Sequence, residues 1–489
     1  MEPSRECREE SGRSPSAGGE LPKGRGPAVL LLPALLALAG YAANLGDFFL
    51  SDDLGFLFSA SHAGTWSEAS RLGGGWNAMW IRPVPLWTFW LQLRVHGATP
   101  WPYHAFDLAF HVLNAGLVGL LAAALTRRRD AGPLAAALFS VCPIHPEAVT
   151  WISGRFDVLA ATGTLACLLA WARYLGTSGR GRHLALSALA LAFGLACKEM
   201  ALAALPLLAG TAWLLRAPRA RALRGLAILG GLVGAYLGLR CWMLGGVGGY
   251  PERTSGQATF FAWPVALRFL PRAFALCFVP AHYADFPQPW HPLKLLPATV
   301  LAVATLRAVR RRGPAPFLRE LAPLLVLFAL SLAPVIGWTQ LHADLQGSRF
   351  LYLPSALACT ALATVLVGGA PQRRSFAVVA STLVVGAWLA GLLLVNRHWS
   401  EAARTAEAMV RRFPADTARP IWVTDLPDHH HGAYVLRNHF DQGVALFVDP
   451  GVDVRVVGHR AWDRELSRRR RKVRLLRWDR ESGTWSDVP

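Results

Sequence analysis

Residues 44–58 read NLGDFFLSDDLGFLF and place three carboxylates, Asp47, Asp52 and Asp53, among phenylalanine and leucine side chains. This stretch follows directly on an apolar run over residues 27–45, which is long enough to cross a bilayer. The run is too long for the core of a signal peptide, and no convincing small-residue cleavage site follows it. We therefore predict a retained first transmembrane helix that ends in an acidic pair.

The composition is that of a polytopic membrane protein, with 53% hydrophobic residues in 489. The chain is basic, with 50 Lys and Arg against 31 Asp and Glu. The arginines fall in short clusters between apolar runs, which is how membrane proteins set their orientation, and no aromatic interleaving typical of nucleic-acid binding accompanies them. We expect no nucleic-acid partner. The seven cysteines are scattered without a CxxC pair, which argues against a thiolate metal site or a disulfide framework.

The predicted fold is an all-α polytopic membrane bundle of about eleven transmembrane helices, at roughly 20 residues per crossing. The apolar runs cover residues 27–45, 105–126, 132–144, 156–175, 184–197, 201–215, 225–243, 292–308, 319–338, 352–369 and 376–395. Arginine-rich links lie at 126–130, 177–183, 216–224, 307–313 and 371–375. All five links fall on the cytoplasmic side if the amino terminus is cytoplasmic, in agreement with the positive-inside rule.

Because successive helices cross in opposite directions, the same helix count places the acidic pair, the loops 46–104 and 244–290, and the tail on the outer side. Residues 1–26 are polar and predicted to be a disordered cytoplasmic segment, residues 27–396 form the transmembrane domain, and residues 397–489 form a small periplasmic α/β domain.

In the tail, residues 400–413 predict an amphipathic helix with Ser400 as its N-cap. The segments PIWVTDLP, VDVRVVGH and RKVRLLRWD that follow it predict strands. The periplasmic assignment follows from the Ala-, Leu-, Arg- and Gly-rich composition, which suggests a high-GC bacterium and its inner membrane.

Polar residues recur at helical spacing near the predicted outer ends of the helices. His104, Asp107, His111 and Asn114 follow one another at intervals of three, four and three, which places them on one helix face. A histidine in an apolar helix is often a satisfied packing residue, but four polar groups on one stripe favour a cavity lining. Charged groups inside a bilayer are expensive and tend to face water or a partner.

The segment CPIHPEAVTWISGRFDVLA, residues 142–160, carries His145, Glu147, Arg155 and Asp157 within thirteen residues. Glu147, Trp151 and Arg155 repeat at intervals of four, so the carboxylate and the guanidinium can meet along a helix, either in a functional pocket or as an ion pair that braces the hairpin. Further charges lie at Lys198, Glu199, Arg240 and Arg349. Cations on the same side as the acidic pair suit a negatively charged leaving group beside a carboxylate base.

Several of these motifs resemble the GT-C membrane glycosyltransferases, above all the branch of transmembrane and tetratricopeptide-repeat O-mannosyltransferases and their bacterial relatives. The motifs are the acidic pair, RPVPLW at 82–87, YHAFDLAFHVLNA at 103–115, HPEAVTWISGRFDVLA at 145–160, CKEMA at 197–201 and RFLYLPS at 349–355. HPEAVTWISGRFDVLA at 145–160 is the most specific of these motifs. The resemblance covers roughly residues 28–370. It departs at Asp107, where an amide is expected, and in the tail, which has no 34-residue repeat.

The resemblance implies an inverting glycosyltransferase that moves a sugar from a polyprenyl-phosphate-linked donor to an acceptor hydroxyl on a protein, lipid or glycan. Asp52 would be the base, and Asp53 would orient it, bind the acceptor or exchange roles with it. The candidates for binding the donor phosphate are, in order of preference, Arg349, Lys198, and then Arg82 and Arg155; Arg82 can equally be an interfacial anchor. The pocket would be completed by His104, Asp107, His111, His145, Glu147, Asp157, Glu199 and Tyr352. Either member of the acidic pair can hold a divalent cation, although no metal is favoured.

Rival functions remain open. A glycan polymerase or ligase would use a lipid-diphosphate donor, a transporter or flippase would use the intramembrane charges as a permeation path, and a scaffold would work through its tail. A transporter is expected to show two related halves with interrupted helices in matching positions, and the sequence shows no such symmetry. The stretch DHHHG at 428–432 is interpreted as a solvent-exposed loop, because three consecutive histidines cannot all face one ion and no second ligand cluster is apparent.

Overall fold

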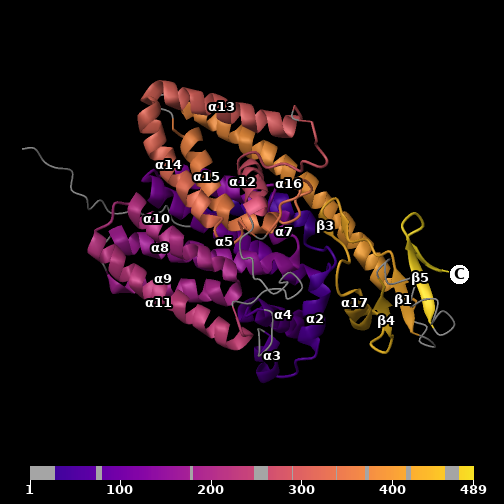
Figure 1. Cartoon of the computed structure of the whole chain (residues 1–489). Coiled ribbons are helices and arrows are strands. Elements are labelled where there is room, and N and C mark those ends of the chain that lie inside the picture. The colour runs from indigo at the N-terminus through magenta and orange to yellow at the C-terminus, as the bar shows by residue number, and fades with distance from the viewer. Residues whose placement is uncertain are drawn as a thin grey trace, which may run out of the picture.

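The computed structural model describes the chain with gaps at both ends and between several elements. The described residues are 28–72, 80–176, 180–246, 263–288, 290–337, 339–368, 374–414, 420–457 and 473–488. The predicted disordered segment 1–26 lies outside them. A helical bundle makes up most of the molecule, and a small sheet region lies at the far end of one long helix, α16 (Figure 1).

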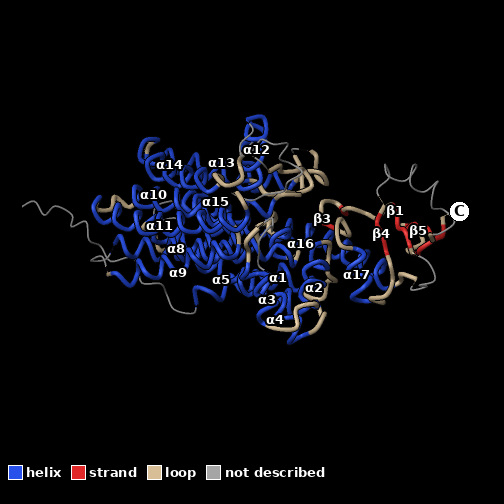
Figure 2. Tube along the Cα trace, turned by 60° about the horizontal axis from the view of Figure 1, so that its bottom comes forward, coloured by secondary structure: helices blue, strands red, loops and turns tan. Residues whose placement is uncertain are grey.

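Every one of the predicted apolar runs forms a helix. These helices are α1 (Ala28–Tyr41), α5 (Pro100–Thr126), α6 (Ala131–Ser140), α8 (Arg155–Gly176), α9 (Gly181–Cys197), α10 (Ala204–Leu214), α11 (Arg219–Leu244), α13 (Pro292–Arg312), α14 (Pro314–Ser331), α15 (Tyr352–Leu366) and α16 (Arg374–Arg411). Within the described residues, seven helices are long and apolar enough to cross a membrane, and four apolar helices are shorter. The all-α polytopic fold is confirmed (Figure 2), while the count of eleven spans stays a prediction.

The predicted outer loops contain helices of their own. Residues 46–104 hold α2 (Asp52–Ser61), α3 (Trp66–Leu72) and α4 (Pro83–His96), and residues 244–290 hold α12 (Trp263–Phe278). Proline at the start of α4 suits the first helical turn, where its missing N–H costs nothing. Helices α2, α3 and α4 lie together at one edge of the bundle, close to the tail (Figure 1).

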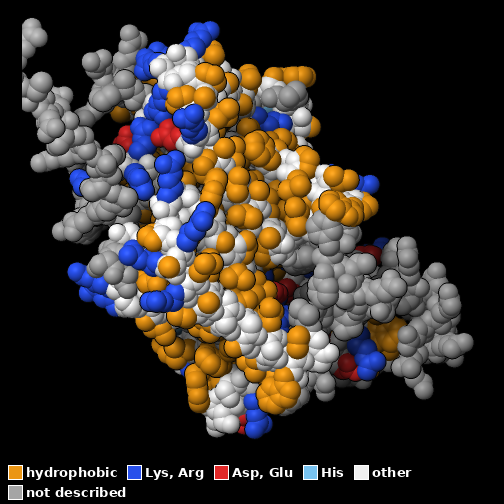
Figure 3. All heavy atoms as spheres, turned by 60° about the vertical axis from the view of Figure 1, so that its left-hand side comes forward, with side chains coloured by type: hydrophobic (Ala, Val, Ile, Leu, Met, Phe, Trp, Pro, Cys, Tyr) orange, Lys and Arg blue, Asp and Glu red, His pale blue; other side chains and the backbone are white. Residues whose placement is uncertain are grey.

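The arginine-rich links lie at one end of the bundle. Arg127 donates to the carbonyl of Leu215, and Arg221 donates to the carbonyl of Leu175, which joins three of the links. Arg128 and Arg312 both reach Glu320 and the carbonyls just before the link at 371–375. One face of the molecule shows a broad apolar surface with lysine and arginine gathered towards one side (Figure 3). This common end is what the positive-inside argument requires of these links.

Small residues bring neighbouring helices into close contact. A Cβ added at Gly163 on α8 would lie 2.5 Å from the main-chain nitrogen of Gly194 on α9. One added at Gly132 on α6 would lie 2.7 Å from the carbonyl oxygen of Gly119 on α5. Backbone contact of this kind is typical of helix pairs in membranes, where dispersion forces and not water exclusion hold helices together.

The tail begins without a break in helix α16. This helix runs for 38 residues through the predicted boundary at residue 396, so Ser400 lies inside it and the predicted N-cap is wrong. The reason is local: no proline or glycine occurs between Leu392 and Arg411, so nothing stops the transmembrane helix from continuing as the amphipathic one. The Ser400 hydroxyl instead donates to Asp47 at 2.8 Å.

The three predicted strands are confirmed as β1 (Ile421–Thr424), β4 (Val454–Val456) and β5 (Arg474–Asp479), joined by β6 (Thr484–Asp487). The strand order is β4-β1-β5-β6; β1 pairs in parallel with both neighbours, and β5 pairs antiparallel with β6. Helix α17 (Phe440–Phe447) lies between β1 and β4 in the chain, as a parallel pair requires. A separate hairpin, β2 (His429–His430) and β3 (Ala433–Tyr434), precedes it.

Candidate functional site

The acidic pair opens helix α2, and its two carboxylates have different surroundings. Asp53 is 1% exposed and accepts hydrogen bonds from the main-chain N–H of Leu50 (2.9 Å) and of Ser153 (2.7 Å) and from the Ser153 hydroxyl. Burial raises the pKa of Asp53 to about 7, although these hydrogen bonds act to lower it. Asp53 therefore fixes the acidic segment to the residues just before α8.

Asp52 is the accessible member of the pair, with 32% of its side chain exposed. Its Oδ1 accepts a hydrogen bond from the amide of Asn438 at 2.8 Å and lies 3.8 Å from Nε2 of His439. Gly55, one turn further along α2, makes room for this contact, because a Cβ there would lie 2.7 Å from the His439 ring. The sequence analysis missed both tail residues, since nothing local marks a contact across nearly the whole chain.

Each of the four cations predicted to bind phosphate is paired with an acidic residue from the predicted pocket. Arg349 pairs with Glu147, Lys198 with Asp157, Arg82 with Glu199 and Arg155 with Asp107. The predicted residues thus come together as pairs that join different helices.

The predicted contact between Glu147 and Arg155 is wrong. Helix α7 (Pro146–Val149) ends before Arg155 begins α8, and the turn between them abolishes the spacing of four. Gly154 permits this turn, because a Cβ there would lie 2.4 Å from the carbonyl oxygen of Ala148. The outcome is that Glu147 and Arg155 point to different partners.

Arg155 is fully buried where α4, α5 and α8 meet. Its guanidinium lies 3.2 Å from Asp107, donates to Gln92 at 2.6 Å and lies over the ring of Phe89 at 4.3 Å. A buried guanidinium needs an anionic partner, which accounts for the carboxylate at position 107 where the resemblance predicts an amide. Arg155 therefore stabilises the packing of α4, α5 and α8, and its surroundings differ from those of Arg349 and Lys198.

A small hollow lies beside α8 and the start of α15. The predicted residues Asp157, Arg349 and Tyr352 line it, together with Ala160, Ala161, Thr164, Met200, Phe350 and Leu353. Lys198 lies next to it, with Nζ 2.6 Å from Asp157 and 4.8 Å from the centre of the Phe350 ring. Arg349 and Asp157 therefore line one small space, and Lys198 contacts that space through its pairing with Asp157.

Trp151 lies between this hollow and the acidic pair. Its indole N–H donates to the carbonyl of Leu50, just before the pair, at 3.2 Å. The guanidinium of Arg349 lies 5.2 Å from the centre of the same indole ring. The acidic pair does not line the hollow itself; the Trp151 side chain contacts Leu50, just before the pair, and Arg349, which lines the hollow.

The polar stripe on α5 is confirmed, but its side chains make contacts between helices in place of a cavity lining. His104 bonds to the carbonyl of Asp47 at 2.9 Å, and His111 and Asn114 bond to the hydroxyl of Tyr352 at 2.8 and 3.2 Å. His145, also buried, bonds to Ser355 at 2.8 Å. Of these groups, only Tyr352 reaches the hollow.

The tail also reaches the Arg349–Glu147 pair. The hydroxyl of Tyr434 on β3 donates to Glu147 at 2.8 Å and accepts from Arg349 at 3.0 Å. The ring of Tyr434 packs at 4.7 Å against Trp151. The tail therefore supplies three residues to the site, Tyr434, Asn438 and His439, none of which the sequence analysis proposed.

Part of the chain is similar in sequence to known proteins, although no protein-family profile matches it. It is 36% identical over 131 residues to the Protein O-mannosyl-transferase Tmtc1 of Drosophila melanogaster, and 35% identical over 191 residues to Tmtc2 of the same species. These matches cover 27% and 35% of this chain, and the chain spans 15% and 20% of the length of the two relatives.

Among solved structures, the chain resembles ArnT from Cupriavidus metallidurans in the apo state, with a TM-score of 0.50 over 93% of each chain at 10% identity. The chain has a GT-C fold. The predicted resemblance to GT-C glycosyltransferases, with O-mannosyltransferases as homologues, is thereby confirmed. The same ArnT bound to undecaprenyl phosphate matches with a TM-score of 0.47 at 13% identity over 93% of each chain. The chain is a multi-pass integral membrane protein.

Proposed function

We propose that this GT-C chain is an inverting glycosyltransferase that moves a sugar from a polyprenyl-phosphate-linked donor to an acceptor hydroxyl. The proposal is supported by relatives named O-mannosyl-transferases and by a fold neighbour that binds undecaprenyl phosphate. The observation that carries it is the division of the acidic pair into one exposed and one buried carboxylate, with Trp151 contacting both Leu50, just before the pair, and Arg349, which lines the hollow.

Asp52 is the proposed base. An inverting transfer needs a group that takes the acceptor proton as the hydroxyl attacks the anomeric carbon. Asp52 is exposed enough to meet an acceptor, and the hydrogen bond from Asn438 holds one of its oxygens and leaves the other for the hydroxyl. The buried Asp53 is a positioning residue, because its oxygens bind the segment that sets the start of α2.

Arg349 and Lys198 are the proposed ligands of the donor phosphate. Both lie at the hollow, and each is held by a carboxylate that a phosphate group can replace or share. The leaving group is a lipid phosphate that departs as an anion, so it needs positive charge more than a proton. Arg82 and Arg155 support neighbouring helices in this proposal, because Arg82 pairs with Glu199 and Arg155 is fully buried against Asp107.

The finer terms of the proposal concern the compartment and the partners. We propose that the site faces the periplasm of a bacterium, with the acidic pair on the side of the bundle opposite to the arginine-rich links. The donor is then an undecaprenyl-phosphate hexose, and the acceptor is a protein, lipid or glycan on that face. Catalysis through Asp52 requires no metal, and a divalent cation at Asp52 and Asp53 stays a separate prediction.

The experiment is a transfer assay with purified full-length protein in lipid nanodiscs. Synthetic polyprenyl-phosphate hexoses are supplied with membrane extract as the acceptor source, and release of polyprenyl phosphate is followed by mass spectrometry. Asp52→Asn should lower the rate at least about 100-fold, the lower end of what a positioned base contributes, without lowering the melting temperature. Asp130→Asn, an exposed carboxylate among the arginine-rich links, should retain full activity. Retention of more than about a tenth of the rate by Asp52→Asn contradicts the assignment of the base.

A further inference from the structure

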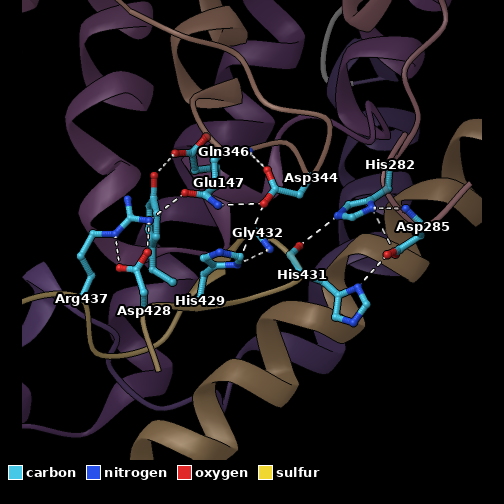
Figure 4. Close-up of polar contacts among 11 residues, drawn as sticks. Glu147, His282, Asp285, Asp344, Gln346, Asp428, His429, His431, Gly432 and Arg437 are labelled. Carbon is cyan, nitrogen blue, oxygen red and sulfur yellow. Dashed lines mark hydrogen bonds and ion pairs between the residues drawn. The ribbon is translucent and has the colours of Figure 1, made fainter. Parts of the chain in front are cut away.

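A second group of ionisable side chains lies away from the acidic pair and plays no part in the proposed transfer. Three histidines from three separate segments meet around Asp285: His282 from the segment that carries Asp285, His398 from α16, and His431 from the β2–β3 hairpin. His430 of the same hairpin lies beside His398 and pairs with Glu401. We call these residues the histidine cluster. Figure 4 shows His282 and His431 on either side of Asp285. The sequence analysis found no further metal-ligand residues to accompany the DHHHG stretch, and the structure supplies them in His282, Asp285 and His398.

Three imidazoles point at one carboxylate. Oδ2 of Asp285 lies 2.5 Å from Nε2 of His398 and 3.1 Å from Nδ1 of His282, and Oδ1 lies 2.7 Å from Nδ1 of His431. One ligand atom from each of His282, Asp285 and His398 falls within 4.8 Å of the others, which is the spread of ligands around a single ion. The rings of His398 and His431 are stacked, with their centres 4.6 Å apart.

The cluster is built into the fold, because most of it is shielded from solvent. His282 is only 1% exposed, and Asp285 and His398 are each less than a fifth exposed. Within the part of the chain that the structure describes, Nδ1 of His398 is buried and has no hydrogen-bond partner.

A second triad shares His398. Ligand atoms of His398, Glu401 and His430 also lie within 4.8 Å of one another, and Nε2 of His430 lies 2.7 Å from Glu401. His398 and Glu401 are three residues apart on α16 and so lie on one helix face. His398 is the residue common to both triads, which makes it the decisive position for a test.

We propose that the histidine cluster binds a divalent transition-metal ion of the zinc class, with Asp285, His398, His282 and His431 as ligands. Imidazole nitrogens with one carboxylate oxygen are a ligand set that Zn²⁺ takes in tetrahedral geometry. An ion at the centre replaces the direct contacts between Asp285 and the rings. It also replaces the hydrogen bond from the main-chain N–H of Asp285 to Nδ1 of His282 (3.1 Å).

The surroundings of His282 fit this role. Its Nε2 bonds to the main-chain carbonyl of His431 at 2.9 Å, so that nitrogen carries the proton and Nδ1 presents its lone pair towards Asp285. Metal-bound histidines almost always donate their second N–H to an oxygen in this way. The same hydrogen bond ties the hairpin to the segment that carries Asp285.

The proposed ion would fix the β2–β3 hairpin against the bundle. Gly432, at φ +86°, follows the histidines and lies so close to the carbonyl oxygen of Asp344 that a Cβ would overlap it. Two residues later, Tyr434 reaches Arg349 and Glu147 at the candidate site. The ion would therefore hold the strand that carries Tyr434 in place, without contact with the acidic pair.

The test measures metal binding directly. Full-length protein is stripped with EDTA and dialysed, Zn²⁺ is titrated calorimetrically, and bound metal is counted by plasma mass spectrometry. We expect one ion per chain in the wild type. His398→Ala and Asp285→Asn should each weaken binding at least tenfold, while His62→Ala, at an exposed histidine just after α2, should not. Wild-type binding that is absent, or equal in His398→Ala and the wild type, overturns the proposal.

A spectroscopic measurement covers the case in which a variant fails to fold. Co²⁺ added to the stripped wild type should give the intense visible absorption of a tetrahedral site, and added Zn²⁺ should remove it; weak octahedral absorption alone also overturns the proposal. Because these readouts need no sugar donor, they are independent of the proposed transferase activity. Asp52→Asn should bind Zn²⁺ as the wild type does, so failure of one proposal is distinguishable from failure of the other.

Discussion

At the scale of single residues, identical side chains acquire different chemistry from their surroundings. Asp52 and Asp53 are neighbours in sequence, yet one is a third exposed and the other is enclosed by three hydrogen-bond donors. Burial disfavours the charged form of Asp53 and raises its pKa. Of the two carboxylates, Asp52 is the more exposed, which is what the proposed base requires.

Asp53→Ala should destabilise the protein by about 3 kcal/mol, because the main-chain N–H groups of Leu50 and Ser153 lose a buried acceptor. Thermal unfolding in detergent, followed by tryptophan fluorescence, measures this loss, with Asp130→Ala as the exposed control. An unchanged melting temperature in Asp53→Ala contradicts the positioning role.

The difference in stability between the wild type and Asp53→Ala should depend on pH. The pKa of Asp53 rises from 3.8 in the unfolded chain to about 7 in the fold, so the folded state holds the proton more tightly. The stability from this group is complete below pH 3.8 and is lost as the pH rises to about 7. The melting-temperature advantage of the wild type over Asp53→Ala should therefore shrink between pH 4 and pH 8. An advantage that grows over this range contradicts the raised pKa.

At the scale of elements, glycine decides where helices touch and where they break. Gly154 allows the chain to turn between α7 and α8, which separates Glu147 from Arg155 and sends each to another helix. Gly163 and Gly194 let α8 and α9 approach to backbone contact along their length. Without these glycines, the residues around the hollow would lose their present positions, because α8 carries Asp157.

Gly163→Ala should destabilise the protein by roughly 1–3 kcal/mol, because the new methyl group would meet the backbone of Gly194, which cannot rotate away as a side chain can. Gly234→Ala on α11 is the matched control. It has no atom within 4 Å of its added Cβ, and alanine is the better helix former, so its stability should equal or exceed that of the wild type. Equal melting temperatures for the two variants contradict the close packing of α8 and α9.

At the scale of the whole molecule, helix α16 joins the bundle to the tail. Asn396, where the span was predicted to end, donates to the carbonyl of Gly40 on α1 (2.9 Å) and accepts from Thr150 (2.6 Å). Asn44 donates to the carbonyl of Asn396 at 3.0 Å. These bonds fix the direction in which α16 leaves the bundle, and so they place Tyr434, carried by the tail, beside Arg349.

Asn396→Ala should cost about 1–3 kcal/mol, since it leaves the buried hydroxyl of Thr150 and the carbonyl of Gly40 without this partner. It should also lower the transfer rate, because the tail loses its fixed direction. Thermal unfolding and the nanodisc transfer assay check both effects. Arg397→Ala, at the next and exposed position of α16, is the control and should change neither quantity. Full activity in Asn396→Ala contradicts a positioning role for this junction.

The sequence alone determined the apolar helices of the bundle, three of the tail strands and most of the charged residues of the candidate site, because apolar runs, strand patterns and short motifs are local properties. It did not determine the partners of those charges. Only the structure shows that Arg155 pairs with Asp107 and Arg349 with Glu147. It alone also shows the hollow, the histidine cluster, and the contacts of the tail with Asp52 and Arg349. Such contacts join segments far apart in the chain, and which segments meet depends on how all the helices pack together, which no local pattern encodes.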